Sequence, residues 1–111
     1  MVFQRGDVVL IPFPYTDLSA TKTRPTVVVS VVEYQGKRGD LILAYLTSQT
    51  AMSDEFDYLL KDWASTGLLK PTLMRARLAV VNERLVQYRI GALSARDLAE
   101  IDERLRHTLG L

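Results

Sequence analysis

The chain has 111 residues, 48% of them hydrophobic and 24% charged, which predicts one globular domain over residues 1–111. Its formal net charge of +1 argues against a protein that simply coats a polyanion. The chain has no cysteine and one histidine, which excludes a disulfide framework and metal sites made from Cys or His clusters. We therefore expect neither a metal nor another cofactor.

Two further signals concern location. No stretch approaches the ~20 consecutive apolar residues that cross a bilayer. Arg5 and Asp7 interrupt the N-terminal region too early for the apolar run of a signal peptide. We therefore expect a cytoplasmic protein with no membrane partner.

The first part of the chain predicts a strand followed by a loop. Residues 8–13 form a short apolar run that contains Pro12 and is followed by Pro14. Because proline cannot donate a backbone hydrogen bond, this pattern is typical of a strand near a sheet edge. Residues 16–24 are polar and rich in Ser and Thr, which predicts an exposed loop.

Two longer strands should follow. Residues 26–32 are a β-branched run typical of a strand buried on both faces, and residues 41–46 form the next apolar run. Residues 35–40 contain two glycines and predict the turn between them. Because this connection is too short for a parallel crossover, we expect the two strands to pair antiparallel.

Two more β segments are predicted in the second half, at residues 58–60 and 73–81. In the second of these, Arg75 and Arg77 alternate with apolar residues at positions 74, 76 and 78. Side chains of a strand point alternately to its two faces. The two arginines should therefore face solvent if the apolar side chains face inward.

The C-terminal segment carries a helix pattern from residue 94 to residue 109. Ser94 is a good N-cap, and Asp97 three residues later resembles the second member of a capping box. Leucine or isoleucine recurs at positions 98, 101, 105 and 109, on one helix face, and Gly110 can end the helix. Several short strands with one terminal helix predict a mainly β, α+β fold, a small barrel.

Charge is distributed unevenly along the chain. Residues 70–89 contain five basic residues against the single acid Glu83, whereas residues 54–62 contain four acids against Lys61. This pattern fits either a basic face beside an acidic loop or the solvated faces of ordinary strands. Both interpretations stay open.

Short motifs follow one another in a fixed order. They are Gly6-Asp7, Phe13-Pro14-Tyr15-Thr16-Asp17, Arg24-Pro25, Thr47-Ser48-Gln49, Lys70-Pro71-Thr72 and Ile90-Gly91-Ala92-Leu93-Ser94 with the helix after it. This ordered set resembles the MazF/PemK family of toxin endoribonucleases, and the resemblance covers nearly the whole chain. It implies a small SH3-like antiparallel barrel with a C-terminal helix.

Arg24 is the first candidate site residue. It precedes Pro25, which favours an extended backbone, and its guanidinium group has a donor geometry suited to a phosphate. The alternative is a structural arginine that caps a barrel end or pairs with Asp17 or another acid. The resemblance implies a catalytic role, because Arg24 matches the arginine of the family's Arg-Pro step.

Thr47 and Ser48 follow the third predicted strand. A hydroxyl group there can donate to a phosphate oxygen or help to orient the attacking group, or the pair can simply form a turn. The resemblance places the family's catalytic hydroxyl at Thr47, with Ser48 and Gln49 as neighbours that bind substrate. Arg24 and Thr47 can meet only if their strands pair.

Further substrate contacts are expected from residues that each have a plain structural alternative. Tyr15 could stack on a base, and Thr16 and Lys22 belong to a loop that could close over RNA. Arg75 and Arg77 could bind the RNA backbone or an acidic protein segment. Aromatic core packing, an exposed loop and a solvated strand face are the corresponding alternatives.

The resemblance implies the toxin of a type II toxin-antitoxin system, an endoribonuclease that cleaves single-stranded RNA without a metal. The RNA 2′-hydroxyl would attack the adjacent phosphate, leaving 2′,3′-cyclic phosphate and 5′-hydroxyl ends. It also implies a homodimer and a cognate antitoxin with an acidic segment. Two alternatives stay open: a scaffold that only binds RNA or protein, and a toxin directed at DNA gyrase. The presence of both Arg24 and Thr47 favours the enzyme.

Overall fold

The computed structural model describes residues 1–13 and 22–111, except for the side chains of Phe13 and Lys22. The strands are β1 (Asp7–Phe13), β2 (Lys22–Val28), β3 (Asp40–Thr47), β4 (Tyr58–Leu59), β5 (Leu73–Asn82) and β6 (Tyr88–Ala92). The helices are α1 (Val32–Arg38), the short 3-10 helix η1 (Glu83–Leu85) and α2 (Ala95–Leu109). None of the described helices is long and apolar enough to cross a membrane.

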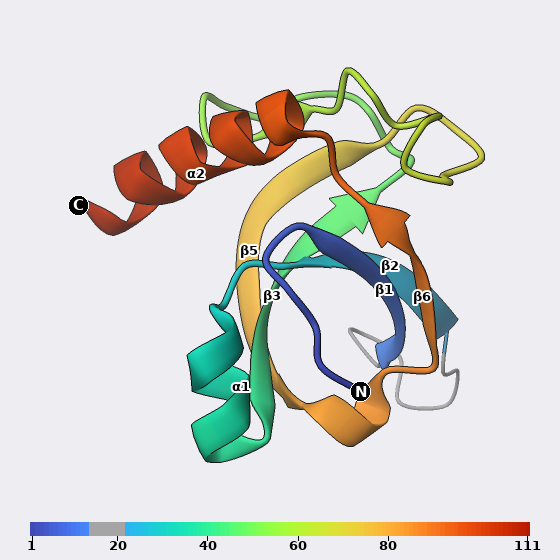
Figure 1. The fold of residues 1–111 in the computed structure, drawn as a ribbon. Helices are drawn as coiled ribbons and strands as arrows, with labels where there is room; N and C mark the ends of the chain where they lie inside the picture. The colour runs from blue at the N-terminus through green and yellow to red at the C-terminus, as the bar shows by residue number, and fades with distance from the viewer. Residues whose placement is uncertain (14–21) are drawn as a thin grey trace.

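The described strands form one antiparallel sheet in the order β4-β5-β3-β2-β1-β6. The sheet curls strongly, so that β1, β2 and β6 face back toward β3 and β5, and α2 crosses one end of the curl (Figure 1). The predicted fold class, an antiparallel barrel-like sheet with a C-terminal helix, is therefore confirmed. The predicted antiparallel pairing of the second and third strands is also confirmed, with Thr26 opposite Tyr45.

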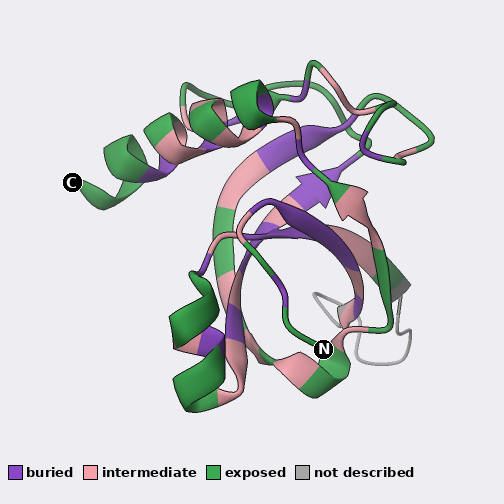
Figure 2. Ribbon diagram, in the orientation of Figure 1, coloured by how far each residue is buried: buried purple, intermediate pink, exposed green. Residues whose placement is uncertain are grey.

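Alternation along β1 divides the apolar core into two clusters. Val8 packs with Leu46, Met74 and Ile101 between the sheet and α2. Its neighbour Val9 points the other way, because successive strand residues alternate in direction. Val9 packs into a second cluster that comprises Phe3, Val9, Ile11, Val28, Leu41 and Leu43. Buried residues accordingly concentrate on the strands and on the side of α2 that faces them (Figure 2).

The first strand lies near a sheet edge, as predicted, although it is not the edge strand itself. Strand β1 lies between β2 and β6, a strand that was not expected. Its residues pair with β6 only from Asp7 to Leu10, so Pro12 lies beyond the end of that ladder and opposes Thr23 of β2 alone. The missing N–H of Pro12 therefore leaves the β1–β6 ladder intact.

The expected turn at residues 35–40 is wrong. Residues 32–38 form helix α1, which ends at Gly39 in the left-handed conformation. Gln35 fixes this helix to the core, since its side-chain oxygen accepts a hydrogen bond of 2.9 Å from the backbone N–H of Phe3. The second strand consequently covers residues 22–28 instead of 26–32, and part of the expected loop, residues 22–24, belongs to that strand.

Helix α2 begins after Ser94, whose hydroxyl accepts a hydrogen bond from the backbone N–H of Asp97, and it ends at Gly110, as predicted. Its apolar face is only partly as expected, since Ile101 and Leu105 are buried whereas Leu109 is 55% exposed. The capping-box interpretation of Asp97 is wrong. The Asp97 carboxylate binds the chain around residue 61 instead of the start of its own helix.

Candidate functional site

Arg24 lies near the start of β2, opposite Ile11 of β1. Its side chain is half-buried, and its Nε atom has no hydrogen-bond partner among the residues that the structure describes. Its guanidinium carbon lies 6.0 Å from the centre of the Tyr45 ring. None of the described acids pairs with Arg24, and Asp17 lies outside the described residues. This side chain therefore keeps a buried donor available.

Thr47 ends strand β3 and is buried. In the ladder between β2 and β3, Thr26 lies opposite Tyr45. Extending the same antiparallel register by two residues places Arg24 opposite Thr47. The Thr47 Oγ1 atom accepts a hydrogen bond of 3.1 Å from the backbone N–H of Gln49. The turn predicted as a structural alternative therefore exists, and in it the Thr47 oxygen acts only as an acceptor. No residue within the described part of the chain accepts the Thr47 hydroxyl proton, which can therefore be donated to a ligand.

One cavity of about 580 Å³ brings the predicted motif residues together. Arg24, Thr47, Ser48 and Gln49 all line it, although 22 or more residues of chain separate the first from the others. Its size falls within the range of ordinary ligand sites. We call this space the Arg24 cavity. An anion entering it would meet a guanidinium donor and two hydroxyl groups.

A second cavity of about 540 Å³ adjoins the first, because Thr47 and Gln49 line both. Arg75 and Arg77 line this Arg77 cavity. The expectation that both face solvent is wrong for Arg75, whose Nη1 lies 2.8 Å from Asp57 Oδ2 and 3.1 Å from Ser53 Oγ. A β-bulge shifts the β3–β5 register after Ala44, which breaks the simple alternation of β5 and leaves Leu78 39% exposed.

Several cavity residues were not predicted from the sequence. Residues 67–70 form part of the lining of the Arg24 cavity, together with Tyr88 and Ile90 of β6. We call residues 67–70 the cavity wall. In the sequence, the Lys70-Pro71-Thr72 motif overlaps the cavity wall, and the motif beginning at Ile90 overlaps β6. Neither motif indicates that the cavity wall and β6 line the same cavity.

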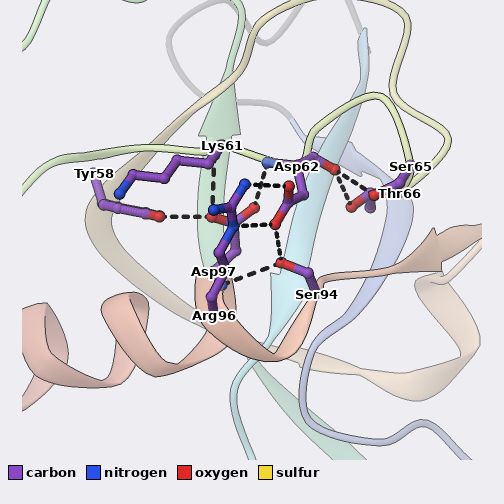
Figure 3. A network of polar contacts seen from close by, with 8 residues as sticks. All are labelled: Tyr58, Lys61, Asp62, Ser65, Thr66, Ser94, Arg96 and Asp97. Atoms are coloured by element: carbon purple, nitrogen blue, oxygen red, sulfur yellow. Dashed lines mark hydrogen bonds and ion pairs between the residues drawn. The ribbon is translucent and has the colours of Figure 1, made fainter.

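A polar network at the start of α2 fixes the chain just before the cavity wall (Figure 3). Asp97 is fully buried, and its carboxylate accepts hydrogen bonds from the Tyr58 hydroxyl at 2.6 Å and from the backbone N–H groups of Lys61 and Asp62 at 3.0 and 2.9 Å. Such a set satisfies a buried charge that would otherwise be costly. Burial and the hydrogen bond to Asp97 raise the pKa of Tyr58 far above its ordinary value.

Asp62 extends this network to the surface. Its carboxylate accepts two hydrogen bonds of 2.7 Å from Arg96 and one of 2.6 Å from the Ser94 hydroxyl. The Arg96 hydrogen bonds, with help from Ser94, lower the pKa of Asp62 from 3.8 to about 2, and the same partnership raises the pKa of Arg96. The pair is therefore charged throughout the physiological range.

The other end of this segment is fixed by close packing. A Cβ atom added at Gly91 would lie 2.1 Å from the backbone oxygen of Thr66, and one added at Gly67 would lie 3.1 Å from the backbone oxygen of Ile90. Only glycine permits this approach of the loop to β6. The segment that leads into the cavity wall, residues 62–66, is thus attached to α2 at Asp62 and to β6 at Thr66.

The remaining predicted site residues are not placed. Tyr15 and Thr16 lie outside the described residues, as does the side chain of Lys22. His107 stacks on Phe56, with ring centres 4.8 Å apart, and lines neither cavity. Over residues 1–13 and 22–111, no group of three or more His, Asp or Glu side chains is placed to hold a metal ion.

The sequence of residues 4–109 matches the PemK-like, MazF-like toxins of type II toxin-antitoxin systems. The chain belongs to this family. Arg24-Pro25 and Thr47, the residues on which the resemblance was first based, are the ones that the fold gathers in the Arg24 cavity. No curated protein sequence matches that of this MazF-like chain.

Solved structures share the fold of this MazF-like protein. An endoribonuclease bound to its cognate antitoxin, from a mycobacterial species, aligns with a TM-score of 0.82 and 18% identity over 98% of this chain and 96% of its own. MazF in a MazE-MazF complex from Deinococcus radiodurans aligns with a TM-score of 0.80 and 23% identity, over 100% and 99%. Mycobacterium tuberculosis toxin MazF-mt6 aligns with a TM-score of 0.75 and 15% identity, over 95% and 97%.

Proposed function

We propose that this MazF-like protein is a metal-independent endoribonuclease that cleaves single-stranded RNA in the Arg24 cavity. The observation that carries the proposal is the buried Nε of Arg24, which has no hydrogen-bond partner over residues 1–13 and 22–111 and lies in the same cavity as Thr47, Ser48 and Gln49. Family membership and the endoribonuclease relatives of the same fold support it. Single strands are the expected substrate because the bases of A-form duplexes are poorly accessible to side chains.

The reaction uses a nucleophile that RNA itself carries. The 2′-hydroxyl oxygen forms a bond to the adjacent phosphorus, and the bond from phosphorus to the 5′-oxygen of the next nucleotide breaks. The 2′-hydroxyl loses its proton and the leaving 5′-oxygen gains one. The products are a 2′,3′-cyclic phosphate and a 5′-hydroxyl, so no metal-activated water is required.

Arg24 and Thr47 would have different tasks in this step. The guanidinium group of Arg24 hydrogen-bonds the phosphate oxygens and stabilises the negative charge that builds on them. Thr47 donates its hydroxyl proton to one of these oxygens, because its oxygen already accepts a hydrogen bond from Gln49. Ser48 and Gln49 bind the neighbouring backbone, and Arg77 holds a further phosphate in the adjoining Arg77 cavity. Lys22, Tyr15 and Thr16 would complete the RNA contacts.

The proposed protein partner is an antitoxin, as in the toxin-antitoxin complexes of similar fold, and we propose that it binds through an acidic segment. Two of the five cations between residues 70 and 89 are already paired, Arg75 with Asp57 and Arg89 with Asp7. The acidic segment should therefore use Lys70, Arg77 and Arg84. Its affinity should fall with added salt, because exposed charges are screened.

We also propose a homodimer. The apolar face of α2 cannot supply its whole interface, because Ile101 and Leu105 are buried in the chain's own core. Val80 and Leu109 remain 59% and 55% exposed, and Leu78, two residues before Val80, points to the same face of β5. A two-fold contact through this patch would hide it in both subunits. Light scattering that shows only monomer at micromolar concentration would contradict it.

The direct test incubates purified protein with single-stranded RNA in EDTA and identifies the product ends. We expect cleavage, cyclic phosphate at the 3′ end and hydroxyl at the 5′ end. A strict need for a divalent metal, or 5′-phosphate products, would contradict the proposed chemistry. Binding of RNA without any cleavage would instead identify an inactive scaffold.

A further inference from the structure

The Arg24 cavity has a polar part and an apolar part. The polar part comprises Thr23, Arg24, Thr47, Ser48, Gln49, Lys70 and Thr72. The apolar part includes Leu10, Pro25, Leu68, Leu69 and Tyr88. The reaction proposed above occupies only the polar part, which leaves the apolar lining without a role.

The apolar part is built on a cross-strand row. Tyr88 of β6 lies opposite Leu10 of β1, and Leu10 lies opposite Pro25 of β2. Directly opposed residues of neighbouring strands share one sheet face, so these three side chains form a continuous surface. Arg24 precedes Pro25 and points to the opposite face of β2, so the guanidinium group and this surface meet as parts of the lining of one cavity. Tyr88 is 63% exposed at its outer end, and Leu69 of the cavity wall is 93% exposed.

We propose that this surface binds one nucleobase of single-stranded RNA, with the Tyr88 ring as its stacking partner. The inference rests on the proposed function and adds the position of a base. A phosphodiester is an anion joined through a sugar to a flat, largely apolar ring. A site with a guanidinium group on one side and an exposed aromatic ring on the other matches both parts of one nucleotide.

Two observations favour a nucleobase over another apolar occupant. The apolar row lines the same cavity as Arg24, whose buried Nε has no hydrogen-bond partner among the described residues, so an uncharged ligand would leave that donor unsatisfied. Tyr88 also lines the cavity and is largely exposed, so a ligand can reach its ring. Base–aromatic stacking tolerates any base, so this contact sets the position of the RNA more than its sequence.

The test measures binding of a single-stranded RNA that the toxin cleaves, made uncleavable by one 2′-deoxy nucleotide at the mapped cut. We expect Tyr88→Ala to weaken binding by about 5- to 150-fold, the usual effect of one base–aromatic stack, and Tyr88→Phe to restore most of it. The matched control is Tyr34→Ala, because Tyr34 lies beneath Arg38 in α1 and lines neither cavity. It should leave affinity unchanged.

An abasic series locates the base. Each nucleotide near the cut is replaced in turn by an abasic one. Removing the base that binds this subsite should weaken RNA binding by the wild-type protein, but it should not weaken binding by Tyr88→Ala any further. If wild-type protein cleaves RNA and Tyr88→Ala binds as tightly as wild type, the inference fails while the proposed function stands. If wild-type protein binds RNA without cleaving it and Tyr88→Ala weakens that binding, the proposed function fails and the subsite stands.

Discussion

The hydroxyl group of Tyr58 in β4 donates a 2.6 Å hydrogen bond to Oδ1 of Asp97 in α2, and both side chains are buried. The same carboxylate holds the backbone of Lys61 and Asp62, from which the chain runs into the cavity wall. A side chain that looks like part of a helix cap therefore connects the helix to the site. We expect its removal to affect more than α2.

Replacing Asp97 with Asn should lower the free energy of unfolding by about 2–4 kcal/mol. The amide can accept on one side only, so at least one buried N–H or hydroxyl donor loses its partner. Urea denaturation of Asp97→Asn beside Asp102→Asn provides the comparison, since Asp102 lies on the same helix but pairs with Arg5 at a half-exposed site. Equal losses in the two variants would contradict a special role for Asp97.

Arg24→Ala should abolish RNA cleavage and leave the fold intact, because Arg24 is half-buried at the cavity and lies outside both core clusters. Arg24→Lys should restore little, since a point charge cannot reproduce the fork of guanidinium donors. Circular dichroism confirms the fold, and gel assays measure cleavage. Full activity in a folded Arg24→Ala protein would remove Arg24 from the site.

Thr47→Ala should slow cleavage by ~100-fold or more if its hydroxyl supports charge on the phosphate. The substitution also removes the acceptor of the Gln49 N–H bond, so Thr47→Ser is the matched variant that keeps both functions of the hydroxyl. Single-turnover rates separate the chemical step from binding. A loss below about threefold for Thr47→Ala would assign Thr47 to the turn alone.

Gly91→Ala should destabilise the protein by about 1–3 kcal/mol, because the new Cβ would overlap the backbone oxygen of Thr66 at 2.1 Å. Gly36→Ala is the control: no atom lies within 4 Å of its added Cβ, and the residue is inside helix α1. That change should stabilise by about 0.5–1 kcal/mol. The two melting temperatures should therefore move in opposite directions.

The contribution of Asp62 to the free energy of unfolding should decrease as the pH falls. Its pKa is lowered from 3.8 to about 2 in the folded protein, so the unfolded chain takes up its proton first as pH falls. The stabilisation is therefore fully present well above pH 4 and is lost between about pH 4 and pH 2. The difference in unfolding free energy between wild type and Asp62→Asn should be constant near neutrality and shrink across that interval.

Local signals in the sequence account for the elements that were predicted well. Helix α2 has its cap at Ser94, its stop at Gly110 and its apolar face within one continuous segment. Strands β3 and β5 were also predicted from apolar residues that lie within one continuous segment each. Arg24 and Thr47 were predicted as site residues from short motifs, because each motif lies next to a strand that the sequence shows clearly.

The elements that were missed depend on partners far away in the chain. Strand β6 contains Gly91 and looks interrupted, yet Gly91 is required by the approach of Thr66. Helix α1 looks like a turn because of Gly36 and Gly39, and it is held by the contact of Gln35 with Phe3. The ion pair of Arg75 with Asp57 follows from the β5 bulge, which alternation along β5 does not indicate.

The segment from Asp62 to Thr66 is fixed at both ends, which restricts the positions near the site where insertions, deletions and substitutions can be tolerated. A residue inserted or deleted between these anchors would break either the carboxylate network or the contact with Gly91. Leu69 lies beyond the second anchor and makes little contact with the rest of the protein, whereas Leu68 packs against the core. Substitutions at position 69 can alter the shape of the cavity at almost no cost to folding. We therefore expect relatives of this chain to differ in RNA preference through residue 69 while keeping the length of the anchored segment.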